Sequence, residues 1–172
     1  MIAKHSLSLR LLHWVMAMMF VSLFAAGLTM VSSLEPWQPS LLALHKAFGL
    51  VALVLFVLRV CVKFSSTPLT SSGDESKLQK MAASSVHFLL YCLMCAVPLT
   101  GILSQYFASK PISFFGIVSI GVKSEPDILL YGLFRELHSL LIAVFALLIF
   151  MHVAGALYHH FIKKDDTLKR ML

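Results

Sequence analysis

The chain has 172 residues, of which 59% are hydrophobic and 13% charged, and its formal net charge is +6. A soluble domain is typically about a quarter charged, so this composition excludes an ordinary water-soluble globule and indicates a protein that lies in lipid. The positive residues stand between apolar runs and form no stripe, which argues against nucleic-acid binding. The three cysteines lie in or beside apolar segments, and an odd number there argues against a disulfide framework.

Four apolar runs follow one another along the chain, and each is close to the ~20 residues with which a helix crosses a bilayer. Arg10 precedes the first run, Lys63 follows the second and Lys163 ends the fourth, while the third contains Pro98. Neighbouring helices in a membrane can accommodate such a proline. The sequence therefore predicts an all-α integral membrane four-helix bundle, a single domain over 1–172, with helices at approximately 8–32, 41–64, 81–107 and 135–163.

The distribution of Lys and Arg predicts the orientation of the bundle. Ten of the 14 lysines and arginines fall on the side that holds both chain ends. The other side holds the remaining four, which are Lys46, Lys110, Lys123 and Arg135. Because positive residues concentrate on the cytoplasmic side, we predict an N-in, C-in orientation. The outer segment 108–134 includes an apolar stretch too short to span, which we expect on the membrane surface or capping the bundle.

Histidines carry most of the chemical information, because ionisable groups inside a membrane are costly and usually functional. Six of the eight lie inside or at the ends of the apolar runs: His13, His45, His87, His138, His152 and His159. His138 and His152 are fourteen residues apart, which is about 21 Å along a helix and within about 40° on its surface. One helix face therefore offers two imidazoles, one near each membrane surface, as two stacked haems b would require.

Each haem iron needs a second axial ligand from another helix of the bundle. Antiparallel packing lets His45 face His138 on the outer side and lets His13 face His152 or His159 on the inner side. Ligation by two histidines suits electron transfer rather than oxygen binding. Two alternatives stay open: single polar residues bonded across helices, and a metal-ion path, which predicts acidic partners inside the helices.

Further polar residues gather near the inner surface. His87 and His159 are candidates for a proton-handling pocket beside the inner haem, since imidazole can protonate a reduced quinone near neutral pH. They could instead bond haem propionates or bridge loops. Arg10, Arg59 and Lys63 lie at the same depth and are candidates to pair with the propionates.

Several short motifs occur in a recognisable order. They are Leu12-His13-Trp14, Leu44-His45-Lys46, His87, Ala96-Val97-Pro98-Leu99-Thr100-Gly101, Leu137-His138, His152, Ala156-Leu157-Tyr158-His159-His160 and the tail Lys164-Asp165-Asp166-Thr167-Leu168-Lys169-Arg170-Met171. In this order and spacing, over essentially the whole chain, the sequence resembles the bacterial cytochrome b561 family of small di-haem membrane proteins. The similarity is greatest to the superoxide oxidases of that family, which are superoxide:ubiquinone oxidoreductases.

The resemblance implies a multi-pass protein of the cell inner membrane and specific roles for its residues. His13 would pair with His152 on the inner haem, and His45 with His138 on the outer haem. Ubiquinone would bind near His87, with His159 beside it, and superoxide would be oxidised to oxygen at the outer side.

A positive patch focuses anions, and the outer side carries candidates for one that would attract superoxide: Lys46, Lys110, Lys123 and Arg135. These four can equally be ordinary rim charges. Two other functions remain open. One is a cytochrome b subunit that relays electrons for a dehydrogenase, hydrogenase or other redox protein partner; the other is a metal-ion transporter.

Overall fold

The computed structural model describes residues 4–32, 35–66, 76–121 and 123–172. Four long helices dominate it: α1 (Leu7–Ser32), α2 (Gln38–Ser65), α3 (Lys77–Phe107) and α4 (Ile128–Tyr158). A π-helix, η1 (His159–Lys163), continues α4, and a 3-10 turn, η2 (Leu168–Arg170), follows. All four helices are long and apolar enough to cross a membrane, so the predicted all-α membrane four-helix bundle is confirmed.

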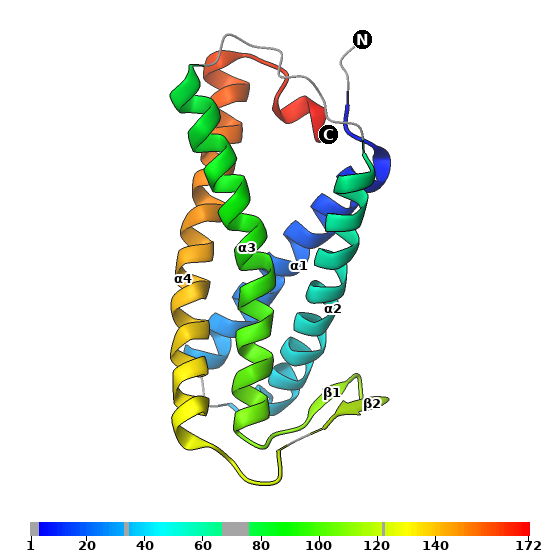
Figure 1. The fold of residues 1–172 in the computed structure, drawn as a ribbon, viewed down its shortest axis with the longest axis vertical. Helices are drawn as coiled ribbons and strands as arrows, with labels where there is room; N and C mark the ends of the chain where they lie inside the picture. Colours follow the sequence, from blue (N-terminus) through cyan, green and yellow to red (C-terminus); the bar gives the residue numbers. More distant parts are fainter. Residues whose placement is uncertain (1–3, 33–34, 67–75, 122) are drawn as a thin grey trace.

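The helices run up and down, so that both chain ends lie at one end of the bundle (Figure 1). We call this the inner end, following the predicted orientation, and the opposite end the outer end. Helix α3 packs most extensively on α4, and α1 on α2. Large apolar side chains cover the outside of the helices, among them Leu28, Val54 and Phe150. Such a surface is stable in lipid and not in water.

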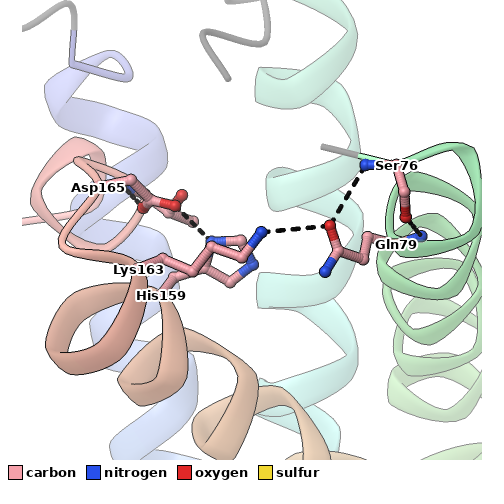
Figure 2. Close-up of polar contacts among 6 residues, drawn as sticks. Ser76, Gln79, His159, Lys163 and Asp165 are labelled. Atoms are coloured by element: carbon pink, nitrogen blue, oxygen red, sulfur yellow. Dashed lines mark hydrogen bonds and ion pairs between the residues drawn. The ribbon is translucent and has the colours of Figure 1, made fainter. Parts of the chain in front are cut away.

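All four helices begin earlier than the apolar pattern predicted, and polar side chains cap the two that differ most, α3 and α4. Helix α3 begins at Lys77 rather than at residue 81. The Ser76 side chain accepts a hydrogen bond from the Gln79 N–H, and the Gln79 side chain accepts one from the Ser76 N–H (Figure 2). Helix α4 begins at Ile128 rather than at residue 135, since Asp127 accepts a hydrogen bond from the Leu130 N–H at 3.1 Å. Such caps satisfy otherwise unpaired N–H groups and extend the helices beyond their apolar parts.

A small β-hairpin that the sequence analysis missed lies in the outer segment. Strands β1 (Ile112–Phe114) and β2 (Val118–Ile120) pair antiparallel. Their turn places Gly116 at φ 76°, a conformation that glycine adopts without strain. Phe115 in this turn packs edge-on against Phe48 of α2, with ring centroids 5.4 Å apart. The hairpin therefore lies beside the outer end of α2 (Figure 1).

The interior of the bundle is built in layers seven residues apart, which is close to two helical turns. The middle layer is apolar: Phe20 of α1, Ala52 of α2 and Phe145 of α4 are buried in one cluster, and Met94 of α3 packs against it. Phe20 and Phe145 meet edge to face with ring centroids 5.0 Å apart. The layers on either side of this one contain the histidines.

Candidate functional site

The outer layer contains two imidazoles, each packed against a glycine of another helix. His45 lies seven residues before Ala52, and His138 seven before Phe145. A Cβ added to Gly27 of α1 would lie 3.7 Å from Cε1 of His45, and one added to Gly101 of α3 would lie 3.1 Å from Cε1 of His138. The two histidines are close enough to interact electrostatically. The structure thus brings together the pair that was predicted for the outer haem.

The inner layer contains three imidazoles and a buried arginine. The ring of His152 lies roughly perpendicular to two others: its centroid is 6.1 Å from that of His13 and 5.2 Å from that of His87. Arg59, only 7% exposed, donates from Nη2 to Nδ1 of His13 at 3.2 Å and from Nη1 to the Leu9 carbonyl at 3.3 Å. His13 and His87 are thus both placed to share a site with His152.

Two more cations lie at this inner level. Lys63 sits 4.1 Å above the ring centroid of Tyr91, and Arg59 lies 5.8 Å from the same ring. The Nε atom of Arg10 is buried and has no hydrogen-bond partner among the described residues. Such a donor is suited to an anion that the protein itself does not supply, as predicted for Arg10, Arg59 and the haem propionates.

His159 lies apart from the inner ring cluster, seven residues beyond His152 and within the π-helical turn η1. Its Nδ1 bonds the carboxylate of Asp165, as Figure 2 shows. Burial acts to raise the pKa of Asp165, but the hydrogen bonds from His159 and Thr167 outweigh it and lower that pKa to about 2. His87, by contrast, contacts His152 itself. Within the described part of the chain, no ring contact joins His159 to His87, so the two predicted quinone residues lie at different depths, with His159 nearer the inner end.

The outer cations are arranged unequally. Lys46 donates to the Pro111 carbonyl at 3.2 Å and lies close enough to Lys110 for their charges to interact. Lys123 instead forms an ion pair with Asp127 at 3.6 Å. Arg135 is exposed, seven residues after the start of α4. Of the four predicted members of an anion-attracting patch, Lys46 and Lys110 therefore lie together, and Lys123 is partly neutralised.

The inner pair has the separation that a haem held by two imidazoles needs, and the outer layer supplies a second pair of imidazoles. Two metal–imidazole bonds of about 2 Å, with roughly 1 Å from each nitrogen to its ring centre, put axial imidazole centres about 6 Å apart. The His13–His152 separation of 6.1 Å agrees with this value. In the outer layer, Nδ1 of His45 is buried without a hydrogen-bond partner among the described residues. The described chain offers no group of three or more His, Cys, Asp or Glu placed to hold a metal ion.

Two kinds of site residue were given no role from the sequence, although Thr100 and Gly101 belong to one of its motifs. The first are Gly27 and Gly101, which occupy in the outer layer the places that histidines take in the inner one: Gly27 is fourteen residues after His13, and Gly101 fourteen after His87. The second is Thr100, buried beside His138. Extending the fourteen-residue spacing of α4 to the other helices would have found both glycines, whereas a threonine in an apolar helix gives no signal of its own.

Comparison with known proteins gives the family. A family model described as prokaryotic cytochrome b561 matches residues 4–172. Cytochrome b561 homolog 2 of Escherichia coli (strain K12) is 35% identical over 162 residues, which cover 93% of this chain and 86% of the relative. Cytochrome b561 homolog 1 of the same organism is 29% identical over 168 residues, covering 94% and 92%. A probable superoxide oxidase CybB of Yersinia pestis is 24% identical over 161 residues, covering 94% and 91%.

These matches extend over the whole bundle, including all the helices that carry the two histidine layers. The relatives have nearly the same length as this chain, so the likeness concerns the complete arrangement and not one shared segment. The chain belongs to the prokaryotic cytochrome b561 family of bacterial membrane proteins, which bind haem b and transfer electrons.

Proposed function

We propose that the protein is a di-haem cytochrome of the inner membrane that oxidises superoxide at the outer face and reduces ubiquinone at the inner face. One observation carries the proposal: imidazoles gather in two layers, with an apolar layer between them. His45 and His138 would hold the outer haem, and His13 and His152 the inner one. On α4 the two layers are fourteen residues apart, or about 21 Å along the helix.

Haem b, when bound in each layer, supplies an iron that takes up and releases one electron at a time. The protein holds the two groups at fixed depths and keeps water from the space between them. Phe20 and Phe145 fill that space. Arg59 and Arg10 would bind the propionates of the inner haem.

At the outer face, the chain has to attract an anion and let a neutral product leave. Lys46 directly follows His45, and Lys110 lies beside it, so two positive charges gather next to the outer layer. Such a pair raises the local concentration of superoxide. Each superoxide gives up one electron and leaves as oxygen, which carries no charge and is not retained.

At the inner face, a quinone needs two electrons and two protons to become a quinol. His87 contacts His152, so a quinone bonded to it would lie next to the inner haem. His159 lies closer to the inner surface and bonds the ionised carboxylate of Asp165. A carboxylate–imidazole pair at this depth can pass protons from water toward the quinone. His87 and His159 would therefore act in sequence along one path.

The proposal is tested with the purified protein in liposomes containing ubiquinone. A reduced-minus-oxidised spectrum with haem quantification should show about two haems b per chain. A pulse of superoxide should then reduce the haems, and quinol should form as they are reoxidised. A preparation with no haem signal overturns the di-haem assignment. Haems that superoxide fails to reduce overturn the superoxide step alone.

A second function, relay of electrons for a dehydrogenase, a hydrogenase or another redox protein, is favoured by the outer hairpin. Ile117 at its turn is 81% exposed and Phe115 is 45% exposed. Apolar side chains at such a place can contact a docked protein. Superoxide-driven quinol formation by the isolated chain would favour the first function. Haem reduction that requires a co-purified protein would favour the second.

A further inference from the structure

His138 is held by one short segment of α3, residues 97–101, through three separate contacts. Its Nδ1 lies 2.9 Å from the Val97 carbonyl oxygen and 3.1 Å from the Thr100 hydroxyl. Its Cε1 lies 3.1 Å from the place where a side chain on Gly101 would begin. Thr100 is itself buried, at 6% exposure. Val97, Thr100 and Gly101 belong to a motif to which the haem assignment gives no role, and all three lie against the His138 ring.

These contacts determine which ring nitrogen carries the proton. A carbonyl oxygen can only accept, so Nδ1 of His138 must donate to Val97. The Thr100 hydroxyl has one proton, and the carbonyls of Ala96 and Val97 lie 3.0 and 2.8 Å from its oxygen to accept it. Its oxygen is then free to accept from the imidazole as well. The proton therefore sits on Nδ1, and Nε2 keeps the lone pair that a metal needs.

Gly101 determines the plane in which the ring lies. A Cβ at 3.1 Å from Cε1 is tighter than nine in ten real Cβ contacts, so the ring would have to shift by a few tenths of an ångström; the other ring atoms near it are Nδ1 at 3.5 Å and Nε2 at 3.7 Å. An alanine would therefore push on the edge of the ring and turn it away from the Val97 carbonyl. Gly27, by contrast, could accept a Cβ at 3.7 Å from His45, which is ordinary contact.

We propose that Val97, Thr100 and Gly101 form a positioning cradle for His138, which presents Nε2 to the outer haem and makes the imidazole a stronger donor. The proposal rests on the proposed function, in which His138 binds that haem. A ligand that donates its other N–H to a carbonyl is more basic and favours the oxidised metal. In the inner layer, the ring of His13 faces the Arg59 guanidinium instead. The cradle is thus specific to the outer haem and should lower its midpoint potential.

The test compares four variants in the holoprotein, with the inner haem as an internal reference. Thr100→Val keeps the shape of the side chain and removes the hydroxyl, whereas Thr100→Ser keeps the hydroxyl. Gly101→Ala adds the clashing methyl group. Gly49→Ala is the matched control, because among the described residues nothing lies within 4 Å of an added Cβ there. The readouts are the two midpoint potentials, the low-spin haem signals in electron paramagnetic resonance, and haem retention during dilution.

We expect Gly101→Ala to weaken retention of the outer haem roughly tenfold or more, as loss of outer-shell support does in metal sites. Thr100→Val should raise the potential of the outer haem, and Thr100→Ser should restore it. Gly49→Ala should behave as wild type, and the inner haem should be unchanged in all four. The cradle is overturned if Gly101→Ala matches Gly49→Ala, or if both haems shift together.

His138→Ala separates failure of the cradle from failure of the proposed function. If this variant loses one haem while Thr100→Val and Gly101→Ala leave both haems as in wild type, only the cradle is wrong. If His138→Ala keeps both haems, the ligand assignment is wrong, and the cradle falls with it.

Discussion

Replacing Phe145 of the middle layer by alanine should destabilise the bundle by several kcal/mol. Phe145 is 2% exposed and packs edge to face against Phe20 at 5.0 Å. The change removes roughly 100 Å³ of side chain, and at about 24 cal/mol per Å³ the cavity costs about 2.4 kcal/mol. The lost aromatic pair adds about 0.5–1.5 kcal/mol. No transfer term is added, because unfolded helices remain in lipid. The expected loss is therefore about 3–4 kcal/mol.

The assay is reversible unfolding in mixed micelles, followed by circular dichroism. Phe150→Ala is the matched control, since Phe150 lies on the same helix, is 71% exposed and has lipid beside it. It should change the unfolding free energy by less than about 0.5 kcal/mol. Both haem signals should persist in each variant, because no imidazole is removed. Equal losses for the two variants would refute the assignment of Phe145 to a packed layer between the two histidine layers.

Three further predictions test the site. His13→Ala should reduce the haem content from about two to about one per chain, whereas His87→Ala should keep both; pyridine haemochrome analysis against protein mass measures this. Lys110→Gln should slow haem reduction by superoxide about two- to fivefold at low salt, with the difference vanishing near 1 M salt in stopped-flow traces. For Asp165, whose pKa falls from 3.8 to about 2 on folding, the stability contributed is complete above pH 3.8 and lost as pH falls through 2. Asp165→Asn should lack that loss in thermal unfolding measured across this pH range.

The membrane bundle could be predicted from the sequence because lipid imposes strong rules on length and polarity. The sequence also predicted that histidines of different helices meet inside the bundle, because ionisable side chains inside a membrane are costly and usually functional. Capped helix starts such as Ser76 and Asp127 extend into water, where the apolar pattern gives no information. For the same reason, the apolar runs did not predict the hairpin around Gly116.

Other features depend on contacts between helices, which a single sequence does not contain. Arg59 was expected near the propionates on depth alone, whereas the structure also places it against His13. Pairing of His159 with Asp165 depends on the π-helical turn and on Lys164, whose φ of 55° reverses the chain. Neither the turn nor the reversal follows from residue type, because lysine rarely adopts a positive φ.

The layered arrangement gives α4 a role that the other helices do not have. Each of α1, α2 and α3 supplies a histidine to one layer and a different residue to the other: Gly27, Arg59 and Gly101. Only α4 has a histidine in both layers, with Phe145 midway between them. A register shift of one residue turns a helix by about 100°. In α1 or α2 such a shift would misplace a ligand of one proposed haem. In α4, a shift that begins before His138 would misplace one ligand of each haem. The register of α4 would therefore set the relation between the two proposed haems, and the helix is fixed between the Asp127 cap at its start and the π-helix at its end.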